Sequence, residues 1–96
     1  MTEQDARFKY EQQGLTVVVV EDEPGEKYEL HRHEAVCLYT LSGSAEVRLD
    51  EGQWRAMQAG DEVEIGNNQL HEVVVRTAGW KYLFAASAGE VARQGL

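Results

Sequence analysis

The chain is built of short runs of β-branched and aromatic residues that are interrupted every few positions by Gly, Pro, Asn, Asp or Ser. Runs of this length predict strands, and the residues between them predict turns. No segment between the runs carries a convincing helical pattern. Seven or eight strands at this spacing predict an all-β fold, an antiparallel sandwich or barrel. The predicted strands are residues 15–21, 28–33, 36–41, 45–50, 54–58, 62–65, 70–76 and 80–87.

The length of 96 residues fits a single domain with one core. We divide it into an N-terminal arm (1–14), a barrel (15–87) and a polar C-terminal tail (88–96). The arm is polar and weakly patterned, so it could be a short helix, an edge strand or a mobile arm. Within the barrel, the Ser42-Gly43-Ser44 and Thr77-Ala78-Gly79 segments are predicted to end strands.

The acidic composition limits the partners of the chain. Seventeen acidic residues against nine basic ones give a formal net charge of -8. This charge repels phosphate backbones and anionic membranes, so we expect neither nucleic acid nor a membrane as partner. The first residues lack the apolar core of a signal peptide, and the longest apolar run, 15–20, is too short to span a bilayer. We therefore expect a cytoplasmic protein, and its single cysteine excludes an internal disulfide.

The three histidines of the chain are the residues most suggestive of chemistry. His31 and His33 are two positions apart, which on a strand places both imidazoles on one face, within reach of one metal ion. His71 begins another predicted strand directly after a Gly- and Asn-rich turn. Spacing alone leaves two interpretations open, a metal site or a set of ordinary surface and core histidines.

The residues around the histidines follow an ordered pattern. Gly25 is followed by five residues, then by His31-Arg32-His33 and later by Gly43. Gly60 is followed by five residues and then by Gly66-Asn67-Asn68-Gln69-Leu70-His71. In order and spacing these two segments resemble the two motifs of the cupin family. Gly66 stands where the family has proline, and Asn68 where it has glycine.

The resemblance covers residues 15–87. It implies a six- to eight-stranded jelly-roll barrel, the double-stranded β-helix of cupins, with a divalent metal ion in its mouth. His31, His33 and His71 match the three histidine ligands of the family. The resemblance implies iron, manganese, nickel or zinc, without selecting among them.

The acidic ligand of the family is missing from its usual place, which falls on Val36, Cys37 or Leu38. Three interpretations remain. The site could use the three histidines alone, with open positions for water or substrate. Cys37 could be a fourth ligand, because it shares strand parity with His31 and His33 if no bulge intervenes, or it could be a small buried residue. Glu34 could reach the site through a bulge, although regular strand geometry turns it away.

Tyr39 and Tyr82 are further candidates, because a phenol inside the barrel could act as an acid or orient a ligand. Aromatic residues in strands are more often part of the core. Together with Cys37, they are the candidate catalytic residues of the chain.

Two functions fit these observations, because one fold hosts many activities. The first is a metalloenzyme of dioxygenase, isomerase or lyase type that acts on a small polar metabolite. The second is a non-catalytic module that senses a ligand or a metal ion. A deep cavity with polar groups beside the histidines would favour catalysis, and a filled interior would favour sensing. In either case we expect a homodimer, which would protect exposed strand edges.

Overall fold

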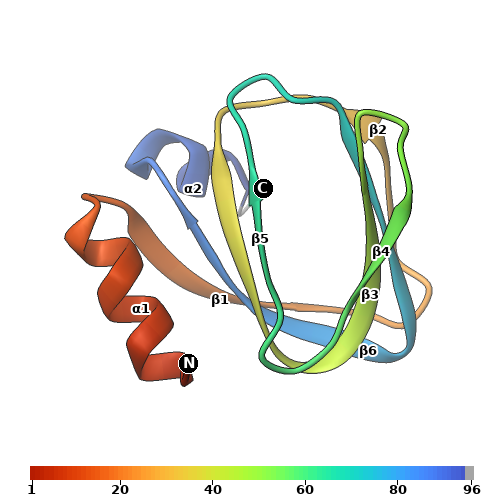
Figure 1. Cartoon of the computed structure of the whole chain (residues 1–96), viewed down its shortest axis with the longest axis horizontal. Helices are drawn as coiled ribbons and strands as arrows, with labels where there is room; N and C mark the ends of the chain where they lie inside the picture. Colours follow the sequence, from red (N-terminus) through yellow and green to blue (C-terminus); the bar gives the residue numbers. More distant parts are fainter. Residues whose placement is uncertain (95–96) are drawn as a thin grey trace.

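The β-branched runs form strands that pair antiparallel into one curled sheet, which closes as a barrel (Figure 1). The computed structural model describes residues 1–94, and within them lie six strands and two short helices. The all-β prediction is confirmed. The strands are β1 (Thr16–Asp22), β2 (Lys27–His31), β3 (Val36–Leu49), β4 (Trp54–Met57), β5 (Glu62–Ile65) and β6 (His71–Ala86). The helices are α1 (Glu3–Gln12) and α2 (Ala88–Gln94).

Two strands are much longer than predicted, because the breaks expected at residues 42–44 and 77–79 lie inside β3 and β6. The backbone there bulges instead of turning back, and the pairing register of β3 with β6 shifts near Ser42 and Gly43. The bulge exchanges the two faces of the strand: Leu38 points into the interior before it and Val47 after it. Eight predicted runs thereby become six strands.

Gly43 and Gly79 allow β3 and β6 to approach closely at this bend. Both have positive φ, of 72° and 73°, a conformation that favours glycine. A Cβ atom built on Gly43 would lie 2.0 Å from the carbonyl oxygen of Gly79. The bend in both long strands therefore depends on the missing side chain at position 43.

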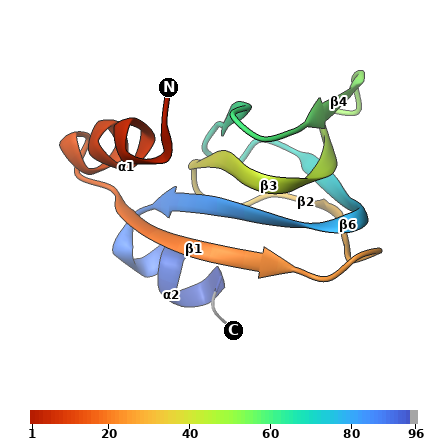
Figure 2. The ribbon, with the colours of Figure 1, turned by 90° about the horizontal axis from the view of Figure 1, so that it is seen from below.

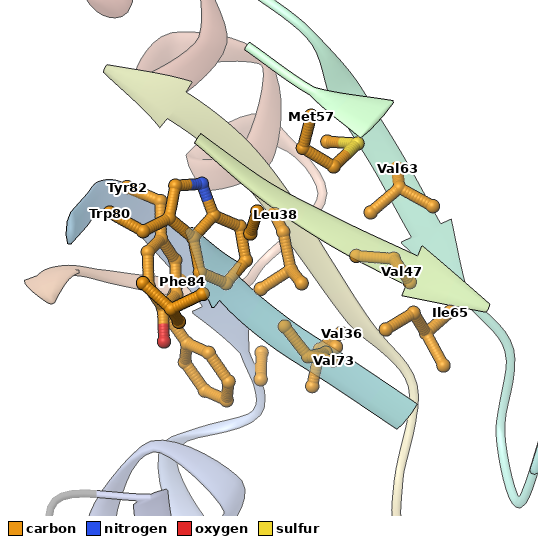
Figure 3. Packing of buried hydrophobic residues seen from close by; sticks show 13 residues of the cluster. Val36, Leu38, Val47, Met57, Val63, Ile65, Val73, Trp80, Tyr82 and Phe84 are labelled. Carbon is orange, nitrogen blue, oxygen red and sulfur yellow. The ribbon is translucent and has the colours of Figure 1, made fainter. Parts of the chain in front are cut away.

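The core consists of two separate clusters. The inner cluster fills part of the barrel, with aromatic rings at one side and aliphatic side chains from β3, β4 and β5 at the other (Figure 3). Its largest members are Leu38, Met57, Ile65, Trp80, Tyr82 and Phe84. The outer cluster lies on the other face of β3 and β6, under α1, and contains Ala6, Tyr10, Cys37, Tyr39, Leu83 and Ala85.

The N-terminal arm forms helix α1. Thr2 caps the helix by accepting a hydrogen bond from the Asp5 N–H, and the Asp5 carboxylate accepts one from the Thr2 N–H, which is a capping box. The helix buries Ala6 and Tyr10, while the Lys9 ammonium and the Tyr10 hydroxyl both donate to Glu62. The arm is therefore a docked helix, one of the three alternatives that the sequence left open.

Within the segment expected as a polar tail, 88–96, residues 88–94 form α2; residues 95–96 lie outside the described part of the chain. The Ser87 hydroxyl caps this helix by accepting from the Glu90 N–H. The two helices cover opposite faces of the β1–β6 part of the sheet (Figure 2). In the described residues, neither helix is long and apolar enough to cross a membrane.

Candidate metal centre

The three histidines meet at one end of the barrel. His31 is the last residue of β2 and pairs with His71, the first residue of β6. His33 lies past the end of β2, in the loop that leads to β3, so the prediction of a strand through residue 33 is wrong by two residues. The loop nevertheless returns its imidazole to the other two. One ligand nitrogen from each ring lies within 4.8 Å of the others.

Backbone carbonyls orient all three rings in the same way. The Nδ1 atoms of His31, His33 and His71 lie 2.5, 2.7 and 2.8 Å from the carbonyl oxygens of Glu29, Glu34 and Gln69. A carbonyl oxygen only accepts, so each Nδ1 carries the hydrogen. Each Nε2 is then left with a free lone pair, which is the form of imidazole that binds a metal ion.

The spacing of two of these lone pairs, those of His33 and His71, fits a cation between them. The Nε2 atoms of His33 and His71 are 3.1 Å apart. Two nitrogens at about 2.1 Å from one ion and at right angles around it would lie about 3 Å apart. With both Nδ1 hydrogens committed to carbonyls, two lone pairs at this distance repel each other unless a proton or a metal ion lies between them. The donor set thus fits a divalent metal ion.

Burial keeps His71 in the neutral form. Its side chain is 2% exposed, and this burial lowers the pKa of His71 below the ordinary histidine value. The hydrogen bond to Gln69 acts in the opposite direction, while the two neighbouring imidazoles lower the pKa further. A neutral imidazole at neutral pH is ready to bind a metal ion without first losing a proton.

A cavity of about 260 Å³ extends from the histidines into the barrel. Its walls are largely apolar with a few polar groups among them, as in sites that bind small molecules. The lining residues that matter below are His31, His33 and His71 at the mouth, Tyr28 and Tyr82 inside, and Glu90 and Arg93 from α2.

Tyr82, one of the predicted candidates, lines this cavity, and so does Tyr28. Both hydroxyls donate to the same carboxylate: Tyr28 to Asp22 Oδ1 and Tyr82 to Asp22 Oδ2, each at 2.9 Å. Burial and the bond to Asp22 raise the pKa of Tyr28 to about 12. Burial and the charge of Asp22 also raise the pKa of Tyr82. Both phenols therefore keep their hydrogens at neutral pH.

Cys37 and Tyr39 lie on the opposite face of β3, in the outer cluster, and neither lines the cavity. Burial raises the pKa of Cys37 to about 11, which keeps it a thiol. The Tyr39 hydroxyl donates to the Met1 carbonyl oxygen at 2.7 Å. Of the two alternatives that the sequence left open for Cys37, the structure agrees with the small buried residue and not with a fourth ligand. The loop after His31 leaves strand geometry, so counting by alternate residues no longer holds.

Acidic residues near the mouth are bound to other groups. Glu34 accepts hydrogen bonds from Ser87 Oγ at 2.8 Å and from Arg93 at 3.4 Å, which turns it toward α2. Glu90 lines the cavity and accepts from Arg93 at 3.0 Å. Burial raises the pKa of Glu90, but the bond and charge of Arg93 outweigh it and hold this pKa below the ordinary value.

Sequence reasoning missed Tyr28, Asp22 and Glu90. Tyr28 is three positions from His31, which predicts opposite faces, but the pairing of β2 with β6 shifts register between them. The Ser87-Ala88-Gly89-Glu90 pattern is a helix-capping signal that could have placed Glu90 at the start of a helix. No sequence signal connects Asp22 to either tyrosine.

Comparison with known proteins agrees with this geometry. Residues 18–82 match the family model of the cupin domain. Among curated proteins, no sequence matches the chain.

Many solved structures are similar. KdgF from Halomonas sp. is 23% identical with a TM-score of 0.67, over 74% of this chain and 66% of that one. DMSP lyase DddQ from Ruegeria pomeroyi DSS-3 is 24% identical with a TM-score of 0.68, over 74% and 36%. Bacillus subtilis oxalate decarboxylase, solved in a study of its Mn(II) centres, is 28% identical with a TM-score of 0.62, over 74% and 20%. The match spans less than two thirds of each of these chains. The family-model match covers most of the sequence, and the chain belongs to the cupin family.

Proposed function

We propose that this cupin holds one divalent metal ion through Nε2 of His31, His33 and His71, and that it is a metalloenzyme acting on a small polar molecule. The observation that carries the proposal is the set of three bonds from Nδ1 to backbone carbonyls, which leaves all three Nε2 lone pairs free. Such outer bonds fix the tautomer and the ring orientation of metal-binding histidines.

The three ligands are neutral, so a bound dication retains its charge and supplies a Lewis acid for a carboxylate, enolate or thiolate group, or a centre for dioxygen chemistry. Imidazole ligands suit iron, nickel and zinc, and oxalate decarboxylase offers manganese as a precedent among the similar structures. The chain's own residues do the remaining work: the histidines bind, and the apolar walls of the cavity exclude water.

The cavity favours catalysis over the alternative, a sensing module without catalytic activity. A space of about 260 Å³ beside the histidines accommodates a small metabolite. Charged and phenolic groups are among its lining residues, and such groups can orient a substrate. The reaction type that we propose is oxygenation, isomerisation or lyase chemistry.

Metal content is the first test. The protein is purified anaerobically without a histidine tag and analysed by inductively coupled plasma mass spectrometry, beside a His31→Ala/His71→Ala double variant and a Cys37→Ser control. We expect about one metal ion per chain in the wild type and in the control, and almost none in the double variant. The metal then selects the assay, oxygen consumption for iron and isomerase or lyase substrates for the others. A wild type that neither contains nor takes up metal would refute the proposal.

The proposal also includes a homodimer, the state expected from the sequence. Phe8 on α1 and Val19 on β1 are 63% and 45% exposed, and such apolar side chains are candidates for a contact between two copies. Sedimentation velocity measures the mass directly. A monomer at all concentrations would remove this part of the proposal without touching the metal site.

A further inference from the structure

Two tyrosines of the cavity wall, Tyr28 and Tyr82, share one hydrogen-bond partner, Asp22, which lies behind them and does not itself line the cavity. Asp22, Tyr28 and Tyr82 come from the end of β1, from β2 and from β6, so three strands supply one cluster. Tyr28 precedes His31 by three residues on β2, which places it up to about 10 Å along the strand from the histidines. The polar lining of the cavity therefore includes the phenols along β2, in addition to the imidazoles and to Glu90 and Arg93 of α2.

The hydrogen bonds of the cluster decide what it can recognise. Each phenol has one hydrogen, and each gives it to a different oxygen of the Asp22 carboxylate, at 2.9 Å. Each phenol oxygen is left with lone pairs only. Both phenol oxygens can therefore accept a hydrogen bond from a ligand. Neither phenol has a hydrogen left to donate to a ligand.

The electrostatics of the cluster point the same way. The carboxylate behind the phenols polarises both hydroxyls and makes their oxygens better acceptors. Its negative charge repels an anionic group and attracts a cation. Trp80 stacks on the Tyr82 ring at 3.7 Å between centroids and donates its own N–H to Thr40, so the phenol is held in place.

We propose that the Asp22–Tyr28–Tyr82 cluster is a specificity site, and that the ligand of this cavity is a small carboxylate with a hydroxyl or an ammonium group at its far end. This inference rests on the proposed function, because the carboxylate of the ligand is directed to the metal ion at the histidines. The donor group of the ligand then lies against the two phenol oxygens, and its carbon chain lies along the apolar wall.

The probes for the test are isosteric. They are n-alkyl carboxylates and the ω-hydroxy and ω-amino carboxylates with the same number of non-hydrogen atoms, such as hexanoate, 5-hydroxypentanoate and 5-aminopentanoate, together with the shorter and longer members of each series. Their dissociation constants are measured by isothermal titration calorimetry on protein of known metal content. The measured quantity is the affinity of a hydroxyl- or ammonium-ended probe divided by the affinity of the methyl-ended probe of equal length.

We expect the wild type to bind the best hydroxyl or ammonium probe about fivefold or more tightly than its methyl counterpart, the effect of about one hydrogen bond. In Tyr28→Phe/Tyr82→Phe the ratio falls to about one, and each single variant lies between. Tyr39→Phe, a buried tyrosine of the outer cluster, keeps the wild-type ratio. The ratio is taken within one protein, so a general loss of stability or of metal affinity cancels. The better of the two donor probes identifies the terminal group.

Three results overturn the inference. In the first, metal-loaded wild type binds methyl probes as tightly as donor probes, or binds none of them. In the second, the double Phe variant keeps the preference, in which case the cluster only joins β1, β2 and β6. These two leave the proposed function intact. In the third, the protein takes up no metal, and the proposed function falls together with the inference.

Discussion

The two faces of β3 and β6 are made by neighbouring residues of the same strands, yet they have opposite properties. On the outer face, Cys37, Tyr39 and Leu83 belong to the cluster under α1, and the Tyr39 hydroxyl donates to the Met1 carbonyl oxygen. On the inner face, Leu38 and Tyr82 border a cavity that leads to three histidines. The same residue type, tyrosine, is a packing residue at 39 and a cavity residue at 82.

The contrast shows that chemistry in this barrel depends on which face a residue occupies. Two tyrosines of similar burial, 4% exposed at position 39 and 3% at position 82, belong to faces with different surroundings, the outer cluster and the cavity. A helix covers one face, and the other borders the cavity that the histidines and the phenols line. The following predictions test this difference, in order of expected effect.

The bulge at Gly43 lets side chains from both halves of β3 point into the interior. We therefore expect Gly43→Ala to lower the free energy of unfolding more than any other change below. Its Cβ would lie 2.0 Å from the Gly79 oxygen, and we expect a loss of more than about 4 kcal/mol in unfolding free energy, or no folded protein. Gly60→Ala is the control, since that position also has positive φ but no atom within 4 Å, and it should cost about 1–2 kcal/mol. Urea denaturation measures both. Equal losses would contradict the role of close approach at the bend.

Replacing a leucine by alanine should lower the free energy of unfolding by different amounts on the two faces. Leu83→Ala on the outer face, where the side chain is fully buried, should lower the unfolding free energy by about 3–5 kcal/mol, because it leaves a closed void. Leu38→Ala only enlarges the existing cavity, so we expect about 2 kcal/mol. Equal values by urea denaturation would mean that the inner face is packed as tightly as the outer one.

Metal binding should stabilise the protein through the inner face alone. At a free metal concentration of 100 times the dissociation constant, the expected gain is about 2.7 kcal/mol. A thermal melt with and without the metal identified above should show the gain in wild type and in Cys37→Ser, and none in His71→Ala. A gain that survives in His71→Ala would place the metal elsewhere.

The smallest effect concerns pH and the outer face. Burial raises the pKa of Glu62, but the hydrogen bonds from Tyr10 and Lys9 outweigh it and lower the pKa below the usual 4.5. A carboxyl with a lower pKa in the folded state stabilises the protein above its unfolded pKa and loses this contribution as pH falls. Stability should therefore decline below about pH 4.5 more steeply in wild type than in Glu62→Gln. Parallel curves would show that α1 docks without this ion pair.

The sequence predicted the strands well, because β-branched runs and Gly- or Pro-containing breaks are local signals. It placed the strand ends poorly at Ser42-Gly43-Ser44, where the local signal for a turn is the same as that for a bulge. The sequence did not decide whether residues 1–14 form a helix, because α1 buries only Ala6 and Tyr10. Two buried residues are too few to make a clear periodic pattern.

For the site, the order of His31, His33 and His71 in two motifs was enough to predict that they meet, which the structure confirms. The inward position of Tyr28 was not predictable, because the pairing register shifts between Tyr28 and His31 and changes which side chains face inward. For Cys37, the sequence could not decide between a ligand and a buried residue, because the strand is interrupted between His31 and Val36. The pairing of Asp22 with Tyr28 and Tyr82 joins three strands, and no short-range pattern encodes it.

Strand β6 pairs with β1, β2 and β3. Because β6 is the last of the six strands to be synthesised, these three strands cannot complete their pairing before it. During synthesis, the earlier strands leave the ribosome without their main partner, and β1 and β2 have no neighbour to pair with until residues 71–86 emerge. The barrel and its histidine cluster therefore form in one late step, since His71 itself begins β6. A nascent chain shortened before β6 should expose unpaired strands and be prone to aggregation, and it should show no trace of the metal site.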